Sequence, residues 1–228
     1  MDYSKWAIIS LGGSIIVPDK IDVTFLCRFR SLINSFKNKK FVIVCGGGAL
    51  NRQYNAAALQ VGKPSDTDLD WIGIRALALN AELVRVLFGR AAYAKVVDDP
   101  NEIKYIPKEK IIVAAAFAPG RSSDYDAVLW ARRFKAKTVI NLSNIPYVYT
   151  ADPQKSRSAK PVKKMKWTDY IKIVGKKWSP RLSSPFDPIA SQLAERLSLR
   201  VLILEGRKIS NVRRAISGSG FEGSMLEP

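Results

Sequence analysis

The sequence predicts an α/β fold in which a largely parallel sheet is covered by helices on both faces. The main observation is that short apolar runs of strand type alternate with longer segments of helical periodicity along the 228 residues. In addition, two of these runs, 6–11 and 41–45, end at glycines and lead into helical segments. A hydrophobic fraction of 47% and a charged fraction of 25% are typical of a globular protein.

Periodicity and turn residues place the individual elements. We expect strands at 6–11, 41–45, 94–97, 111–116, 138–142, 201–204 and 224–226. We expect helices at 22–36, 49–61, 71–88, 123–135, 167–174, 187–197 and 208–216. Three prolines between Ile145 and Lys166 predict loops and a short hairpin, and 180–185 is a further expected loop.

Several of the expected helices begin at residues suited to capping. Asp22 is the expected N-cap of the helix 22–36, and Asp70 that of the helix 71–88. Asp187, followed by proline, opens a third helix. The apolar face of the helix 22–36 recurs at spacings of three and four and consists of Phe25, Leu26, Phe29, Leu32, Ile33 and Phe36.

The two glycine-ended strands predict phosphate-binding turns. Gly12 and Gly13 follow the first strand, and Gly46, Gly47 and Gly48 follow the second. Bare backbone lets an anion approach the peptide N–H groups, and the N-terminus of the next helix adds favourable potential. A single glycine turn is about as often an ordinary tight turn. Because there are two, we expect them at one edge of the sheet, facing a shared cleft.

The rarer residue types exclude several classes of chemistry. The chain has no histidine, which excludes histidine catalysis and histidine metal sites. Its two cysteines, Cys27 and Cys45, are expected to be small core residues in a reducing compartment. A hard cation such as Mg²⁺ remains compatible, since it needs few protein oxygens. No apolar run reaches the ~20 residues of a membrane span, and the N-terminus does not have the pattern of a signal peptide.

The chain is strongly basic. Its 37 Lys and Arg against 20 Asp and Glu give a formal net charge of +17. Nine basic residues and one acid lie between Lys155 and Lys177. Such a charge favours anionic ligands, either nucleotides or nucleic acid, whereas the commoner alternative is a solvated basic face.

An ordered set of short motifs resembles a known family. The motifs are Leu11-Gly-Gly-Ser14, Gly46-Gly-Gly48 with Arg52, Asp70-Trp-Ile-Gly-Ile74, Pro119-Gly-Arg-Ser-Ser123, Ser143-Asn144, Val148-Tyr-Thr-Ala-Asp-Pro153, Lys163-Lys-Met-Lys166 and Phe186-Asp-Pro-Ile-Ala190. Together they are similar to the amino-acid kinase fold and, within it, to the archaeal-type uridylate (UMP) kinases. The resemblance runs from about residue 6 to the end of the chain.

This resemblance implies a fold and a reaction. The fold would be a three-layer αβα sandwich forming one domain over 1–228, with 1–142 mainly binding UMP and 143–228 mainly binding ATP. The reaction would transfer the γ-phosphoryl group of ATP, with Mg²⁺, to UMP in pyrimidine nucleotide biosynthesis. The family's UMP kinases are usually hexamers, and the expected location is the cytoplasm without membrane attachment.

The resemblance also implies roles for individual residues. Arg52 and Asn144 would be catalytic. The UMP side would consist of Gly47, Asp70, Phe117, Ala118, Pro119, Gly120, Arg121, Ser122 and Ser123. The ATP side would consist of Gly12, Gly13, Ser14, Gly48, Arg52, Ser143, Asn144, Tyr149 and Asp152, together with one lysine of the cluster 155–177. No protein residue is assigned as a metal ligand.

The residue types fit these roles but leave alternatives open. Arg52 lies one turn after the second glycine turn and off most of the apolar stripe formed by Leu50, Tyr54, Ala57, Ala58 and Val61, so its alternative is a solvated arginine. Asp70 either holds UMP or is only a helix cap. Ser122 and Ser123 are either caps or phosphate donors, and Tyr149 is either part of the site or a half-buried aromatic.

The sequence departs from the family pattern at three informative positions. Ser10 stands where many family members carry a lysine, Pro146 stands in place of a carboxylate, and Tyr147 stands in place of a glycine. Two alternatives to a UMP kinase therefore remain. One is a related kinase with another acceptor, and the other is a non-catalytic module that binds nucleotides or nucleic acid.

Overall fold

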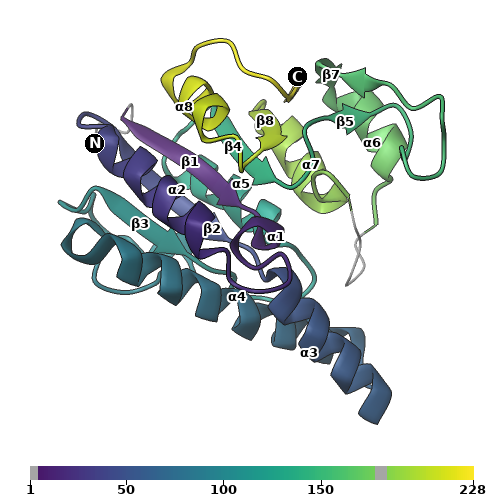
Figure 1. Ribbon diagram of the computed structural model, residues 1–228, viewed down its shortest axis with the longest axis horizontal. Coiled ribbons are helices and arrows are strands. Elements are labelled where there is room, and N and C mark those ends of the chain that lie inside the picture. Colours follow the sequence, from purple (N-terminus) through teal and green to yellow (C-terminus); the bar gives the residue numbers. More distant parts are fainter. Residues whose placement is uncertain (1–4, 178–183) are drawn as a thin grey trace.

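The computed structural model describes residues 5–177 and 184–228, and its centre is a seven-stranded sheet with helices on both sides (Figure 1). The strand order is β3-β2-β1-β4-β8-β9-β7. The strands are β1 (Trp6–Leu11), β2 (Lys40–Cys45), β3 (Ile111–Ala114), β4 (Thr138–Ser143), β7 (Lys164–Lys166), β8 (Arg200–Glu205) and β9 (Ser224–Glu227). The first five in the spatial order pair in parallel, and β9 runs antiparallel to β8. The mainly parallel sheet is thus confirmed.

Helices cover both faces of this sheet. They are α1 (Gly13–Ile16), α2 (Val23–Ser35), α3 (Gly48–Val61), α4 (Asp66–Phe88), α5 (Ser123–Arg133), α6 (Trp167–Val174), α7 (Pro188–Arg196) and α8 (Ile209–Ser217), with short 3₁₀ turns at Gly89–Ala91 and Pro100–Glu102. The expected hairpin is also present, because β5 (Val148–Tyr149) pairs antiparallel with β6 (Pro161–Val162).

Alternation along the strands divides the interior into two cores. One core packs alternate strand residues such as Ile9 and Ile43 against α2, α4 and α8. The other packs the opposite set, including Ile8 and Val42, against α5, α6 and α7. Strands buried on both faces have the continuous apolar runs seen in the sequence. The three-layer arrangement is therefore confirmed.

Two expected elements differ in detail. The segment 94–97 is not a strand; the chain here pairs with the edge strand β3 through isolated bridges at Ala92 and Val97. Residues 94 and 95 between these bridges are exposed, so the edge of the sheet is covered at two points without a continuous ladder. The short helix α1 was not expected, because four residues are too few for a periodic pattern.

The apolar stripe of α3 is not buried against the sheet. The described side chains of α3 that are buried are Ala49 and Asn55, whereas Tyr54 is 62% and Val61 91% exposed. Figure 1 shows the C-terminal part of α3 projecting beyond the sheet. A periodic apolar face thus marked a helix correctly, but much of this face stays exposed in the part of the chain that the structure describes.

Three smaller expectations are resolved as follows. Cys45 is buried as expected, but Cys27 is exposed on the outer face of α2, and both are free thiols. Residues 180–183 of the expected loop lie outside the described residues. Within the described part of the chain, no helix has the length and apolarity needed to cross a bilayer.

Candidate active site

The two glycine turns meet backbone to backbone at the carboxyl ends of β1 and β2. These strands pair in parallel up to Leu11 and Cys45, and Gly46 N donates to Leu11 O at 3.0 Å. A methyl group added to Gly13 would lie 2.6 Å from Gly47 N, and one added to Gly46 would lie 2.5 Å from Gly13 N. The two turns therefore share one edge of the sheet, as expected, and neither of these glycines has room for a side chain.

The N-terminus of α3 has no side-chain cap at this edge, although Ala49 N donates to Val17 O at 2.8 Å. Gly47 is the N-cap and supplies no side chain, and Gly48 has a φ of +63°, which favours glycine. By contrast, α4, α5 and α7 are capped by the side chains of Ser65, Ser122 and Asp187. Because helix N-termini present N–H groups that need acceptors, an uncapped helix beside bare backbone is suited to bind an anion.

The strand order reverses next to the first glycine turn. The chain passes from β1 towards β2 and β3 on one side, while β4 and β8 lie on the other. Gly12 N donates to Leu142 O at 2.9 Å, so the ends of β1 and β4 are joined at this point. Ser143 and the exposed Asn144 follow directly, and Ser143 Oγ accepts from Ile145 N at 3.1 Å. In open α/β sheets, such a reversal is where ligands bind.

A buried asparagine that the sequence analysis did not single out positions the second glycine turn. Asn80 on α4 donates through Nδ2 to Gly46 O at 2.8 Å and to Gly47 O at 3.0 Å. Its side chain is almost fully buried. A signal was available in the sequence, because Asn80 is a polar residue on the face that also carries Leu77 and Ala81.

Arg52 links the helix that follows the second glycine turn to the loop that follows α1. It lies in the second turn of α3, is exposed, and donates through Nη2 to Pro18 O at 2.8 Å. Pro18 belongs to the loop that follows α1, and therefore to the segment after the first glycine turn. Among the described residues, no carboxylate is paired with Arg52. Its charge is thus free to act on a ligand phosphate.

Asp70 is not a helix cap, which corrects one expectation. The helix begins five residues earlier than expected, because Ser65 and Asp68 form a capping box that the sequence analysis missed. Asp70 lies inside α4, and its Oδ2 accepts from Gly120 N at 2.6 Å. This hydrogen bond holds α4 against the turn 117–123, so two parts of the expected UMP side are brought together.

The turn 117–123 is stabilised by its own arginine. The Arg121 guanidinium lies 4.1 Å from the centre of the Phe117 ring and 5.3 Å from that of Tyr125, and its Nε lies 3.3 Å from Asp126 Oδ1. Ser122 is the N-cap of α5, since its Oγ accepts from the N–H two residues further on. Thus Ser122, rather than Ser123, has the capping role. The described contacts of Arg121 all lie within its own turn and the first turn of α5.

A cluster of buried carboxylates lies beneath this turn. It adjoins Ser10, the position where many members of the family carry a lysine. Asp124 accepts from Ser10 Oγ at 3.0 Å, from Asn141 Nδ2 at 2.9 Å and from Asp187 N at 3.3 Å. Ser10 and Asn141 are register partners on β1 and β4, so both side chains point to the same face. Burial and, to a lesser extent, the neighbouring Asp187 together raise the pKa of Asp124 to about 7. The serine and the amide thus replace a cation as partners of this acid.

Asp126 is the least compensated of these acids. It is fully buried, neither oxygen has a hydrogen-bond partner among the described residues, and Arg121 Nε is 3.3 Å away. Burial raises the pKa of Asp126 to about 7, partly offset by Arg121. A raised carboxyl pKa means that the folded state binds a proton that the unfolded state has already lost.

This proton makes stability depend on pH. Between about pH 4 and 7 the free energy of unfolding should fall as pH rises, and above about pH 7 this contribution should level off. Asp126→Asn, which resembles the neutral acid, should remove ~2 kcal/mol of the fall between pH 5 and 8. Urea unfolding at both pH values measures this, with the exposed Asp19→Asn as the control. An unchanged fall in Asp126→Asn would contradict the assignment.

The remaining ATP-side residues lie on separate segments. Tyr149 is half-buried on β5, and Ser14 is half-buried in α1. Asp152 shapes its own turn, accepting from Gln154 N at 2.9 Å and pairing with Lys155 Nζ at 3.8 Å. In the described part of the chain, no side-chain hydrogen bond or ion pair joins Tyr149 or Asp152 to the glycine turns.

A family model matches most of the chain. The model described as the amino acid kinase family covers residues 5–205. The chain belongs to the amino acid kinase family. Within this family, uridylate kinases from Methanospirillum hungatei and Pyrococcus abyssi are each 31% identical to it. The matches cover 96% of this chain and 93% of the first relative, and 97% of this chain and 99% of the second.

A solved structure is similar to this chain over nearly its whole length. The uridylate kinase of Archaeoglobus fulgidus superposes with a TM-score of 0.82 at 29% identity, covering 97% of this chain and 99% of that one. The glycine turns, the helix N-terminus without a side-chain cap and the strand reversal therefore belong to a fold in which a full-length relative is a uridylate kinase.

Proposed function

We propose that the chain transfers the γ-phosphoryl group of ATP to UMP, giving UDP and ADP. The observation that carries this proposal is the backbone contact between the two glycine turns at the point where the strand order reverses. Phosphoryl transfer requires positioning and charge neutralisation rather than covalent help from the protein. Two adjoining glycine turns at one edge of the sheet suit two phosphorylated ligands that meet end to end, and relatives of full length are uridylate kinases.

We assign the two ligands to opposite sides of this contact. UMP would lie beside Gly47, Asp70 and the turn 117–123, mainly within 1–142. ATP would lie towards Gly12, Gly13, Ser14, Gly48, Ser143, Asn144, Tyr149 and Asp152, mainly from 143 onwards. Arg52 would neutralise charge on the phosphate that moves, with Asn144 as a second catalytic residue.

Mg²⁺ would bind to the ATP phosphates rather than to a protein cage. Within the described residues, no group of three or more Cys, Asp or Glu side chains is arranged to hold a metal ion. Mg²⁺ commonly binds through substrate phosphates and retained waters. When bound, the ion would withdraw charge from the transferred group, and the protein's part would be to hold the phosphates in line.

The role of Asp70 provides a test of the acceptor side. Asp70→Asn keeps the acceptor for Gly120 N but removes the charge, so it should raise the KM for UMP about tenfold or more while the KM for ATP stays constant. Steady-state kinetics with each substrate varied in turn would measure this. Asp66→Asn, an exposed acid in the first turn of the same helix, is the matched control. Equal UMP kinetics in both variants would show that Asp70 only braces the turn 117–123.

We also propose that the protein is a homo-oligomer, a hexamer by its family resemblance, and that it is located in the cytoplasm. An apolar hollow of 430 Å³ between α3 and α4 supports the oligomer; it is lined by Leu50, Tyr54, Trp71, Ile72, Arg75, Ala76 and Leu79. Tyr54 and Leu79 there are 62% and 63% exposed. The free thiols Cys27 and Cys45 suit a reducing compartment.

A charge in this hollow should dissociate the oligomer. Tyr54→Asp should shift the protein to a smaller species in sedimentation velocity, because an unpaired carboxylate in an apolar interface loses its hydration. Ile173→Asp, at a residue 45% exposed on the distant α6, should leave the sedimentation coefficient unchanged. A wild-type protein that sediments as a monomer would refute the oligomer.

A further inference from the structure

A large groove lies away from the glycine turns, and the basic side chains that line it are not paired with acidic ones in the described part of the chain. It is a groove of about 1090 Å³ that begins at the amino ends of β1, β4 and β8 and passes below the loop that follows α8. Five cations line it: Lys39, Lys135, Lys137, Lys163 and Arg200. The structure gives none of the five an ion-pair partner among the described residues.

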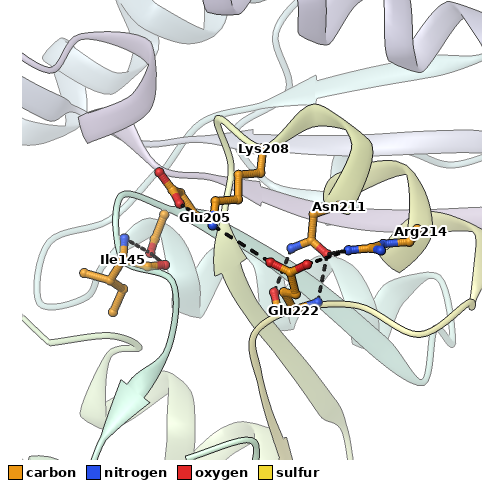
Figure 2. Close-up of polar contacts among 7 residues, drawn as sticks. Ile145, Glu205, Lys208, Asn211, Arg214 and Glu222 are labelled. Carbon is orange, nitrogen blue, oxygen red and sulfur yellow. Dashed lines mark hydrogen bonds and ion pairs between the residues drawn. The ribbon is translucent and has the colours of Figure 1, made fainter. Parts of the chain in front are cut away.

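The one acid among the described lining residues is already neutralised. Glu222 pairs with Arg214 at 3.1 Å and with Lys208 at 3.9 Å, and Lys208 also pairs with Glu205 (Figure 2). Asn211 binds the backbone of Glu222 on both sides, donating to its carbonyl at 2.7 Å and accepting from its N–H at 2.8 Å. The loop that forms this wall is therefore fixed to α8, and its carboxylate does not offset the five cations.

The cations form a row rather than a single cluster. Lys39 precedes β2, Lys137 precedes β4 and Arg200 begins β8, so these three lie at the amino ends of parallel strands. Lys163 precedes β7, which runs antiparallel to β8, so its backbone is level with the middle of β8. From β2 to β8 the sheet order has three steps, which is ~14 Å at ~4.8 Å per strand. This length equals about four stacked nucleotides at ~3.4 Å each, at the lower end of the ~4–16 nucleotides of common single-strand sites. A mononucleotide would reach only part of the row.

Helix termini account for one of these charges but not for the others. Lys135 directly follows the last turn of α5, where a cation offsets the helix dipole. Lys137 and Arg200 lie at the starts of strands, where no such dipole acts. Neither an ion pair among the described residues nor a helix dipole therefore explains the charges of Lys137 and Arg200.

The groove also offers surfaces for bases. The half-buried rings of Tyr147 and Phe221 line it, between apolar floor residues such as Leu202 and Met225. Tyr147 stands where the family pattern has a glycine, and nothing in the proposed kinase reaction uses it. Sites that bind single-stranded nucleic acid without sequence preference combine two features, cations along the backbone and aromatic rings that stack on bases. This groove has both.

We propose that this groove binds single-stranded nucleic acid, with the cations along the backbone and Tyr147 and Phe221 against bases. The site lies at the opposite end of β1, β4 and β8 from the glycine turns, so it is separate from phosphoryl transfer. It gives a role to five of the cations behind a net charge of +17, which small phosphorylated substrates do not require.

The test is fluorescence anisotropy with an end-labelled oligothymidylate of 12 nucleotides, titrated from 50 mM salt upwards. Lys137→Ala with Arg200→Ala should weaken binding at least ~tenfold at 50 mM salt. It should also reduce the slope of log K against log salt by ~1.4, since each phosphate contact contributes ~0.7. Tyr147→Ala should weaken binding ~fivefold or more without changing the slope.

A charge-matched variant separates the groove from overall charge. Lys63→Ala with Lys104→Ala removes the same charge from two exposed lysines outside the groove and should change the affinity less than twofold. Melting temperatures of all variants, followed by circular dichroism, confirm that each is folded. An equal loss in this control would overturn the proposal, as would absence of binding by the wild type. Displacement of the oligonucleotide by tripolyphosphate at equal charge would also overturn it, by indicating a site for a small polyanion.

Discussion

Replacing Arg52 by alanine should reduce UDP formation at least ~100-fold while leaving the melting temperature nearly unchanged. The side chain is exposed, and its one described hydrogen bond is to Pro18 O, so its loss should cost less than ~1 kcal/mol of stability. The effect on turnover should be large because a cation beside both glycine turns can neutralise the charge of the phosphate in transfer.

The measurement is kcat in a coupled assay together with thermal unfolding of the same samples. Arg30→Ala, which removes an exposed arginine from α2, is the matched control and should retain full turnover. If Arg52→Ala turns over at the wild-type rate, Arg52 is a solvated surface arginine and the catalytic assignment fails. If it loses activity only together with its fold, its role is structural.

Replacing Gly13 by alanine should abolish turnover and also destabilise the protein by ~3 kcal/mol or more. The added methyl group would lie 2.6 Å from both Gly46 C and Gly47 N, and these are backbone atoms that cannot rotate away. The two turns would have to separate, which would misplace both phosphate-binding backbones by a distance that phosphoryl transfer does not tolerate.

Chemical unfolding and the coupled assay measure the two parts of this prediction. Gly220→Ala is the matched control, because it adds the same methyl group where no atom lies within 4 Å. Retention of activity in Gly13→Ala would mean that the contact between the turns is not needed for the reaction. It would also remove the main structural support for the proposed function.

The fold was largely predictable from the sequence because its strands are short apolar runs that end at unmistakable glycines. Parallel strands buried on both faces leave a strong pattern, and the caps Asp22 and Asp187 were recognised from residue type and position. The start of α4 was missed, because a polar run from Ser65 to Asp68 resembles a loop until its capping box is recognised.

Features that depend on contacts between distant segments were harder to predict from the sequence. The hydrogen bond from Gly120 N to Asp70 joins residues 50 apart, and that from Ser10 to Asp124 joins residues 114 apart. Periodicity says nothing about such pairs. The buried acids were overlooked for the same reason, since an aspartate near a helix start is usually an exposed cap. The exposed stripe of α3 shows that an apolar face indicates a helix but not what covers it.

The central claim is that this chain phosphorylates UMP, and one assay of the wild-type protein tests it most directly. Purified protein is incubated with ATP, Mg²⁺ and each nucleoside monophosphate in turn, and ADP release is followed by a coupled assay. We predict turnover with UMP at a kcat/KM well above that for AMP, GMP or CMP, and UDP as the product. Nucleotide binding without turnover for any acceptor, or a clear preference for another acceptor, would contradict the account.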